Sequence, residues 1–295
     1  MQWLEDSTIL TDDEVVRLVR IGVELLGIRT VRLTGGEPLI RPRLLALVAR
    51  LSALTPRPEL ALTTNGLALA RVATGLVEAG LTRVNISLDT LRRDRFREIT
   101  GRDRLHDVLA GIDAAIAAGL SPVKLNAVLL RGVNDDEAPD LLDFCLAKGI
   151  ELRIIEQMPL DPMGAWDRAA MITASEILDS LSGRFSLTPN PAPRGAAPAS
   201  TWLVDGGPAR VGIIASVTAP FCGTCDRTRI TADGMVRNCL FARDEDDLLT
   251  GMRAGLDDLA VAAQWVAAMA GKKAGHGIDD PSFLQPDRPM SAIGG

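Results

Sequence analysis

The chain has 295 residues, of which 47% are hydrophobic and 24% are charged, and its formal net charge is −6 at pH 7. This length allows one large domain or two modest ones, and the acidic balance argues against nucleic acid or an anionic membrane surface as a partner. No apolar run reaches the roughly 18 residues of a membrane-spanning helix, and the acidic start MQWLEDSTIL is not expected to be a signal peptide.

The first part of the chain, to about residue 160, alternates helical and strand patterns. A helix is predicted to begin at Thr11, which can cap the acidic first turn of TDDEVVRLVRIGVELLG. Alternating strands and helices require parallel strands with right-handed crossovers, so the pattern indicates a barrel, a part-barrel or an open sheet. The expected strands lie within residues 30–38, 60–66, 83–90, 122–130 and 150–160, and the expected helices within 43–54, 70–81, 91–119 and 137–149.

Polar residues gather where these strands end. In parallel α/β folds the ligand site forms at the carboxyl ends of the strands. Gly, Asn and Asp also end strands for conformational reasons alone, so one such group means little. Five groups in the same position favour a site: Thr34–Glu37, Thr63–Asn65, Ser87 with Asp89, Lys124 with Asn126, and Glu156–Met158.

After residue 165 the alternation stops. A helix is expected at SEILDSLSGRF, a Pro/Ala-rich connector at 186–201 and a strand at ARVGIIASV. The stretch RTRITADGMVRNCLF predicts two short strands around an Asp-Gly turn. Helices are expected within 244–255 and 257–275, and the tail has little periodicity.

Three of the four cysteines, Cys222, Cys225 and Cys239, lie in one short stretch, while Cys145 stands apart. This clustering is typical of metal ligands in a reducing cytoplasm. Spacing alone leaves two alternatives open: zinc completed by a distant ligand, or a [4Fe–4S] cluster held by three thiolates with one iron open. Arg227 and Arg229 share one face of the following strand and would suit a polyphosphate, although such a pair is often a solvated face.

The stretches VRLTGGEPLIR, LTTNG, VNISLDT, VKLNAVLLRGVND and CGTCDRTRITADGMVRNCLF follow one another in this order, and the chain ends in Gly-Gly. Together they resemble the GTP 3′,8-cyclase family, the MoaA-type radical SAM enzymes of molybdenum-cofactor biosynthesis. The resemblance covers essentially the whole chain. It implies an incomplete TIM-type (β/α)6 radical SAM barrel and a smaller α+β C-terminal region that carries a second iron–sulfur cluster.

The resemblance also implies roles for individual residues, without naming a catalytic residue. S-adenosylmethionine would be bound by Gly36, Ser87 and Met158. GTP would be bound by Arg32, Thr63, Lys124, Arg227, Thr228 and Arg229. The second [4Fe–4S] cluster would be held by Cys222, Cys225 and Cys239, and the tail Gly294-Gly295 would enter the active site.

The implied function is a lyase reaction, the radical cyclisation of GTP to (8S)-3′,8-cyclo-7,8-dihydroguanosine 5′-triphosphate. The implied partners are an electron donor and cyclic pyranopterin monophosphate synthase downstream, and a homodimer is left open. The expected parts are a radical SAM core at 1–165, a cluster and GTP-binding region at 166–275, and the tail at 276–295.

One departure from the family is the absence of the C-x3-C-x2-C motif that holds the first cluster. Cys145 lies in a helix and is expected to be a core residue. The core is therefore expected to lack its first strand and cluster loop, as after a late start, and the chain as written is expected to be inactive without that cluster. The alternative is a truncated or degenerate, non-catalytic GTP- and iron–sulfur-binding paralogue. A zinc-stabilised α/β binding module is a third interpretation.

Overall fold

A computed structural model describes residues 5–161, 166–280 and 283–293. They fall into two compact units. Unit 1 comprises Met1–Leu62, Gly75–Thr82 and Asp226–Gly295, and unit 2 comprises Thr63–Thr74 and Arg83–Cys225. In the described part of the chain, no helix is long and apolar enough to cross a membrane.

Unit 2 is built on strands in the order β3-β4-β5-β8-β7-β6. The first four run parallel to one another, and β8, β7 and β6 run antiparallel. The strands are β3 (Arg83–Ser87), β4 (Val123–Val128), β5 (Glu151–Ile155), β6 (Leu187–Pro189), β7 (Ser200–Val204) and β8 (Arg210–Ile214).

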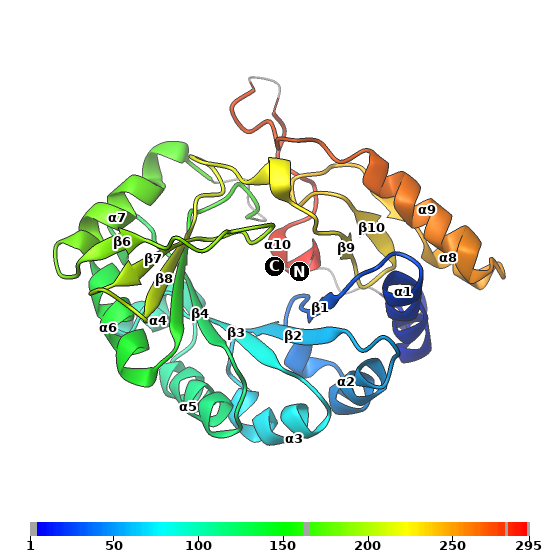
Figure 1. Ribbon diagram of the computed structural model, residues 1–295, viewed down its shortest axis with the longest axis horizontal. Helices are drawn as coiled ribbons and strands as arrows, with labels where there is room; N and C mark the ends of the chain where they lie inside the picture. The colour runs from blue at the N-terminus through cyan, green and yellow to red at the C-terminus, as the bar shows by residue number, and fades with distance from the viewer. Residues whose placement is uncertain (1–4, 162–165, 281–282, 294–295) are drawn as a thin grey trace. The chain divides into compact units, whose positions relative to one another are not determined.

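Helices connect the parallel strands of unit 2, and α5, α6 and α7 lie along one side of the sheet (Figure 1). Helix α7 begins at a capping box in which Thr173 and Glu176 bond each other's backbone N–H groups, and α6 ends at Gly149 in the left-handed conformation. The helices are α4 (Arg93–Thr100), α5 (Leu105–Ala117), α6 (Ala138–Lys148) and α7 (Ala174–Ser182), with 3-10 turns η3 (Leu69–Arg71), η4 (Asp135–Glu137), η5 (Arg168–Ala170) and η6 (Cys222–Thr224).

One expectation for unit 2 is confirmed and another is wrong. The strand expected at ARVGIIASV is β8, which pairs in parallel with β5. The expected connector at 186–201 contains β6 and the start of β7. Strand β6 ends at Pro189 and pairs only with β7 among the described residues, and a proline is tolerated at such an edge because its missing N–H is not needed there.

Unit 1 contains the parallel pair β1–β2 and the antiparallel sheet β11-β10-β9. Strand β2 and helix α3 each contribute residues to both units. The elements are η1 (Asp6–Thr8), α1 (Asp12–Glu24), β1 (Thr30–Leu33), η2 (Pro38–Ile40), α2 (Leu44–Ser52), β2 (Glu59–Thr64), α3 (Ala73–Glu78), β9 (Arg229–Ile230), β10 (Met235–Arg237), β11 (Asp246–Asp247), α8 (Leu249–Arg253), α9 (Asp258–Ala270) and α10 (Met290–Ile293).

Most sequence-based expectations for unit 1 are confirmed. Thr11 caps α1 in a capping box with Glu14, and the Asp-Gly turn joins β9 to β10. The helix expected within 244–255 is shorter, because β11 occupies its start. The tail, expected to lack periodicity, forms the short helix α10.

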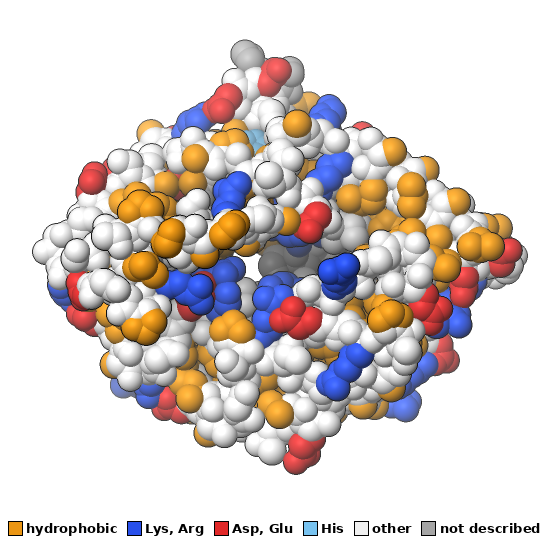
Figure 2. All heavy atoms as spheres, in the orientation of Figure 1, with side chains coloured by type: hydrophobic (Ala, Val, Ile, Leu, Met, Phe, Trp, Pro, Cys, Tyr) orange, Lys and Arg blue, Asp and Glu red, His pale blue; other side chains and the backbone are white. Residues whose placement is uncertain are grey.

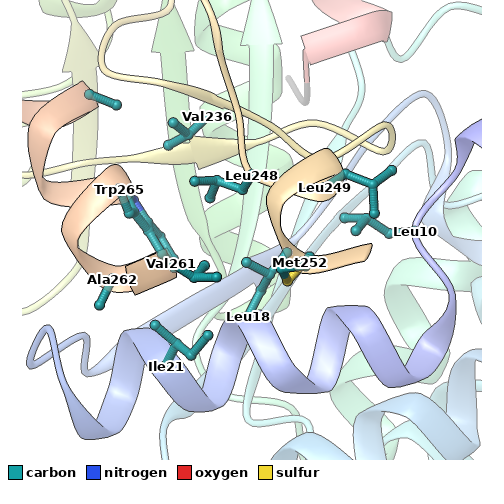
Figure 3. Close-up of a cluster of buried hydrophobic side chains, with 11 residues drawn as sticks. Leu10, Leu18, Ile21, Val236, Leu248, Leu249, Met252, Val261, Ala262 and Trp265 are labelled. Atoms are coloured by element: carbon teal, nitrogen blue, oxygen red, sulfur yellow. The ribbon is translucent and has the colours of Figure 1, made fainter. Parts of the chain in front are cut away.

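An apolar core within unit 1 joins residues near the N-terminus to strand β10 and helices α8 and α9 (Figure 3). Leu18 and Ile21 of α1 pack with Val236 of β10 and with Val261 and Trp265 of α9. The opposite face of α9 carries the exposed residues Leu259 and Val266, and Figure 2 shows apolar side chains over this helix. The hairpin formed by β9 and β10 is therefore anchored on residues near the N-terminus.

Candidate functional site

Strands β3, β4 and β5 of unit 2 separate polar from apolar side chains. Successive side chains of a strand point to opposite faces, so register partners two residues apart share a face. Asn85 is registered with Lys124, which in turn is registered with Glu151. We call the resulting set the polar face: Arg83, Asn85, Ser87, Lys124, Asn126, Glu151 and Arg153.

Two residues of the polar face are buried, four are half-buried, and Ser87 is exposed. Lys124 is 8% exposed and Asn85 is 7% exposed, while Leu125 and Ile154 on the opposite side are 0% exposed. Burying a polar group costs free energy unless the group finds a hydrogen-bond partner. A polar face in the middle of a parallel sheet is typical of a ligand-binding surface.

Lys124, Glu151 and Arg153 form a charged cluster on the polar face. The Glu151 Oε1 atom accepts hydrogen bonds from Lys124 Nζ at 3.4 Å and from Arg153 Nε at 2.9 Å. Burial, and next the charge of Arg153, lower the pKa of Lys124 to about 8. Burial alone would raise the pKa of Glu151, but Arg153 and Lys124 outweigh it and hold that pKa below its ordinary value.

Two asparagine side chains of the polar face have buried oxygen atoms without a protein partner. They are Asn85 Oδ1 and Asn126 Oδ1, in the part of the chain that the structure describes. Asn126 lies next to Ser87 in the register of β3 and β4. An unsatisfied buried acceptor costs about 1–3 kcal/mol, so these atoms point to a ligand that donates hydrogen bonds.

Other polar residues at the strand ends shape the surrounding loops. Glu156, 1% exposed after β5, accepts hydrogen bonds from the backbone N–H groups of Ala174, Val217 and Thr218. Burial raises the pKa of Asp89, whose Oδ1 accepts from Val128 N at 2.8 Å. Met158 is half-buried in the loop that follows Glu156.

In unit 1, the turn after β1 lies against the C-terminal tail. Gly35 has φ +130°, which favours glycine, and the Glu37 side chain accepts from Leu39 N at 3.0 Å. A Cβ atom at Gly36 would lie 3.5 Å from the backbone oxygen of Ser291, at the start of α10. Arg32 is exposed on β1. The tail therefore reaches the Gly-Gly-Glu turn within this unit.

The hairpin of unit 1 carries the arginine pair predicted to bind a polyphosphate. Thr228 Oγ1 accepts from the indole Nε1 of the buried Trp265 at 2.8 Å, and the Arg227 carbonyl oxygen accepts from Lys272 Nζ at 2.7 Å. Thr228 is thereby attached to α9, with Arg227 directly before it and Arg229 directly after it at the start of β9.

Cys222 and Cys225 bound the 3-10 turn η6, where Cys225 N donates to the Cys222 oxygen at 3.1 Å. Both thiols are half-buried at the two ends of this turn, and their C-x2-C spacing is typical of two ligands of one cluster. Cys239, also half-buried, belongs to unit 1. In the described residues no three Cys, His, Asp or Glu side chains gather as a metal site, so the three-cysteine set stays a prediction.

Cys145 is buried in α6, as expected for a core residue. Burial raises the pKa of its thiol to about 12, which keeps it protonated, whereas a metal ligand must be a thiolate. The chain has four cysteines in all, so the other three fit one cluster and leave none for a second. The cysteines of this sequence therefore do not fit the first cluster of the family.

The predicted site residues are divided between the units. Unit 2 brings Ser87 and Lys124 together on the polar face, and also contains Thr63, Met158, Cys222 and Cys225. Unit 1 contains Arg32, Gly36, Arg227, Thr228, Arg229 and Cys239. Gly294 and Gly295 lie outside the described residues.

Asn85, Glu151 and Arg153 were not predicted from the sequence as members of the site. The signal was present, because VNIS, VKLN and ELRI all place polar residues at alternate positions of apolar strands. Period-two alternation with charged residues inside three consecutive buried strands would have identified them.

Comparison with known proteins identifies both parts of the chain. The profile of the Radical SAM superfamily matches residues 2–145, and that of Molybdenum Cofactor Synthesis C matches residues 150–278. The chain is 60% identical over 296 residues to GTP 3′,8-cyclase of Streptomyces coelicolor, covering 100% of this chain and 87% of that protein. It is 55% identical over 299 residues to GTP 3′,8-cyclase 2 of Mycobacterium tuberculosis, covering 100% of this chain and 83% of that protein.

Among solved structures, that of TYW1 with a lysine-pyruvate adduct bound has a TM-score of 0.43 and 19% identity, covering 60% of this chain and 62% of that chain. The family profiles and the mostly parallel α/β architecture confirm the expected partial TIM-type radical SAM barrel. Radical SAM membership implies a [4Fe–4S] cluster and S-adenosylmethionine as cofactors. From these matches over its whole length, the chain belongs to the GTP 3′,8-cyclase family of radical SAM enzymes.

Proposed function

We propose that the chain serves the cyclisation of GTP to (8S)-3′,8-cyclo-7,8-dihydroguanosine 5′-triphosphate, the first step of molybdenum-cofactor biosynthesis. The observation that carries this proposal is the 60% identity, over the whole chain, to a protein named GTP 3′,8-cyclase. The polar face supports it. A nucleoside triphosphate needs both cations and hydrogen-bond partners in a site that excludes water, and this face supplies both.

The chain's own residues bind and orient the substrate. GTP contacts Arg32, Thr63, Lys124, Arg227, Thr228 and Arg229. Gly36, Ser87 and Met158 contact S-adenosylmethionine. The cationic side chains offset the triphosphate charge in a chain whose net charge is −6. Holding the sugar against the base in this way prepares the cyclisation.

The cofactors supply the radical chemistry when they are bound. Cys222, Cys225 and Cys239 would hold one [4Fe–4S] cluster, which would offer the substrate a Lewis-acidic iron. Cyclic pyranopterin monophosphate synthase consumes the product, and a separate donor supplies electrons. A homodimer and the three-part division at residues 165 and 275 also belong to this proposal.

GTP binding tests the proposal on the chain itself. Isothermal titration at fixed salt should give a GTP affinity that Arg229→Ala weakens roughly 10- to 100-fold, since a hydrogen bond to a charged group contributes about 1.5–3 kcal/mol. Arg102→Ala removes an exposed arginine of unit 2 and should change nothing. Unchanged affinity in both Arg227→Ala and Arg229→Ala, with the cluster loaded, would make this pair a solvated face.

A second candidate is a non-catalytic paralogue that binds GTP and one cluster. The cysteine count favours it, because one chain supplies thiolates for only one cluster. GTP binding is common to both candidates. They are separated by whether the reading frame upstream of residue 1 encodes the C-x3-C-x2-C motif of the first cluster.

A further inference from the structure

Glu151 occupies a central position on the polar face that the family resemblance does not assign. It is the register partner of Lys124 across β4 and β5, and it shares its strand face with Arg153. One oxygen atom, Oε1, accepts from both cations. The side chains of Lys124, Glu151 and Arg153 are 10%, 12% and 13% exposed, so solvent screens this cluster little.

The charges around Lys124 oppose one another. Burial, then Arg153 on β5 and finally Arg83 on β3, lower the pKa of its ammonium group. Glu151 raises that pKa, through its charge and its hydrogen bond. Glu151 is in turn influenced by Arg210 on β8, in addition to Arg153 and Lys124. The positive charge of Lys124 near neutral pH therefore depends on Glu151.

We propose that Glu151 is a positioning residue, which fixes the direction of the Lys124 ammonium group and supports its charge so that it meets a phosphate of the bound nucleotide. Arg153 in turn orients Glu151, because its Nε donates to the Glu151 carboxylate at 2.9 Å. This inference rests on the proposed function, in which Lys124 contacts GTP.

The proposal predicts the direction of a pH effect. A bound phosphate favours charged Lys124 and raises its pKa, so GTP affinity is complete below the pKa of the free protein, about 8, and falls as the pH rises above it. Removing the Glu151 charge lowers that pKa further. The fall in affinity should then begin at a lower pH.

Calorimetric titration with GTP at several pH values between about 6.5 and 9 tests this, with the midpoint in Glu151→Gln expected about one unit lower than in the wild type. Glu151→Asp keeps the charge and should restore the midpoint, even if the shorter side chain weakens binding. Glu98→Gln removes an exposed acid on α4 and changes the net charge as Glu151→Gln does. Its pH profile of GTP binding should follow that of the wild type. At pH 8 we expect Glu151→Gln to bind GTP roughly fivefold more weakly than Glu98→Gln, with the ratio shrinking toward one at pH 6.5.

An NMR titration of Lys124, read from isotopically labelled lysine without GTP, gives the pKa of Lys124 in the free protein, which should shift in the same direction and does not depend on binding. Circular dichroism melting verifies that each variant is folded. If Glu151→Gln binds GTP with the pH profile of Glu98→Gln, the inference is overturned and the proposed function stands. If the wild type binds no GTP at any pH, both are overturned.

Discussion

Two glutamates of unit 2 have contrasting roles at the scale of the single residue. Glu151 faces two cations, whereas Glu156 is surrounded by backbone donors from the N-terminus of α7 and from the loop after β8. Thr218 adds its hydroxyl group to the same carboxylate. A carboxylate without cations but with several N–H donors holds loops together, so Glu156 fixes the segment that leads toward η6 and its cysteines.

Replacing Glu156 with glutamine tests this role. The amide has one acceptor oxygen and a donor NH2 group, so N–H groups that now share two oxygens would lose a partner while buried. We expect a loss of roughly 2–4 kcal/mol in the free energy of unfolding, since each unsatisfied buried group costs about 1–3 kcal/mol. Urea denaturation measures it, with the exposed Glu98→Gln as control. A loss below about 0.5 kcal/mol, the scatter of surface substitutions, would show that these loops do not depend on Glu156 for their stability.

The buried Cys145 provides a second prediction at this scale. Burial raises the pKa of its thiol to about 12, so at pH 8 almost none of it is the reactive thiolate. Iodoacetamide should therefore modify Cys145 far more slowly than the half-buried Cys222, Cys225 and Cys239 in the metal-free protein. Mass spectrometry of tryptic peptides gives the rates. Modification of Cys145 at a rate equal to the other three would contradict its burial in α6.

At the scale of elements, local sequence patterns predicted most of the fold. Caps such as Thr11 and Thr173 mark helix starts because their side chains satisfy backbone N–H groups locally. The short strands β6, β7 and β11 could not be predicted, since their pairing partners lie elsewhere in the sheets and supply the missing stability. Prediction of the site has the same limit. Lys124 lies in a sequence motif of the family and could be predicted, whereas the role of Glu151 depends on its pairing with Lys124 across two strands.

The tail of unit 1 is held by an ion-pair network. Arg288 donates to both oxygens of Asp233, at 2.9 and 2.7 Å, and lies 3.1 Å from Glu245. Glu245 also accepts from the buried Arg237. These contacts attach the segment before α10 to the turn between β9 and β10, close in sequence to Cys239. Farther along the tail, the backbone oxygen of Ser291 lies near the Gly36 turn.

Arg288→Ala should release the tail from the turn. We expect amide exchange of residues 288–293 to accelerate about tenfold, the equivalent of roughly 1.4 kcal/mol of local opening. The matched control is Arg243→Ala, because Arg243 lies 3.5 Å from Asp287 in a largely exposed pair and should contribute little. Hydrogen exchange read by mass spectrometry distinguishes the two. Equal exchange in both variants would mean that the Arg288 ion pairs do not hold α10 in place.

At the scale of the whole molecule, the distribution of cysteines limits the cofactors that the chain can hold. Three cysteines lie between residues 222 and 239, and the fourth is the buried Cys145. A radical SAM enzyme requires thiolate ligands for the cluster that binds S-adenosylmethionine, and the polar face and the hairpin do not replace them. These 295 residues should therefore hold one cluster, and radical generation would need thiolate ligands from outside them.

Anaerobic reconstitution of the 295-residue chain measures this limit directly. We expect about four irons and four sulfides per chain, the content of one [4Fe–4S] cluster. Cys145→Ser should keep that content, whereas Cys222→Ser should lose it, because only the second removes a ligand of the predicted set. With dithionite and S-adenosylmethionine, no 5′-deoxyadenosine should form above a control without protein. Its appearance would show that another ligand set supports the radical step, and one zinc per chain without iron would replace the cluster with a structural metal site.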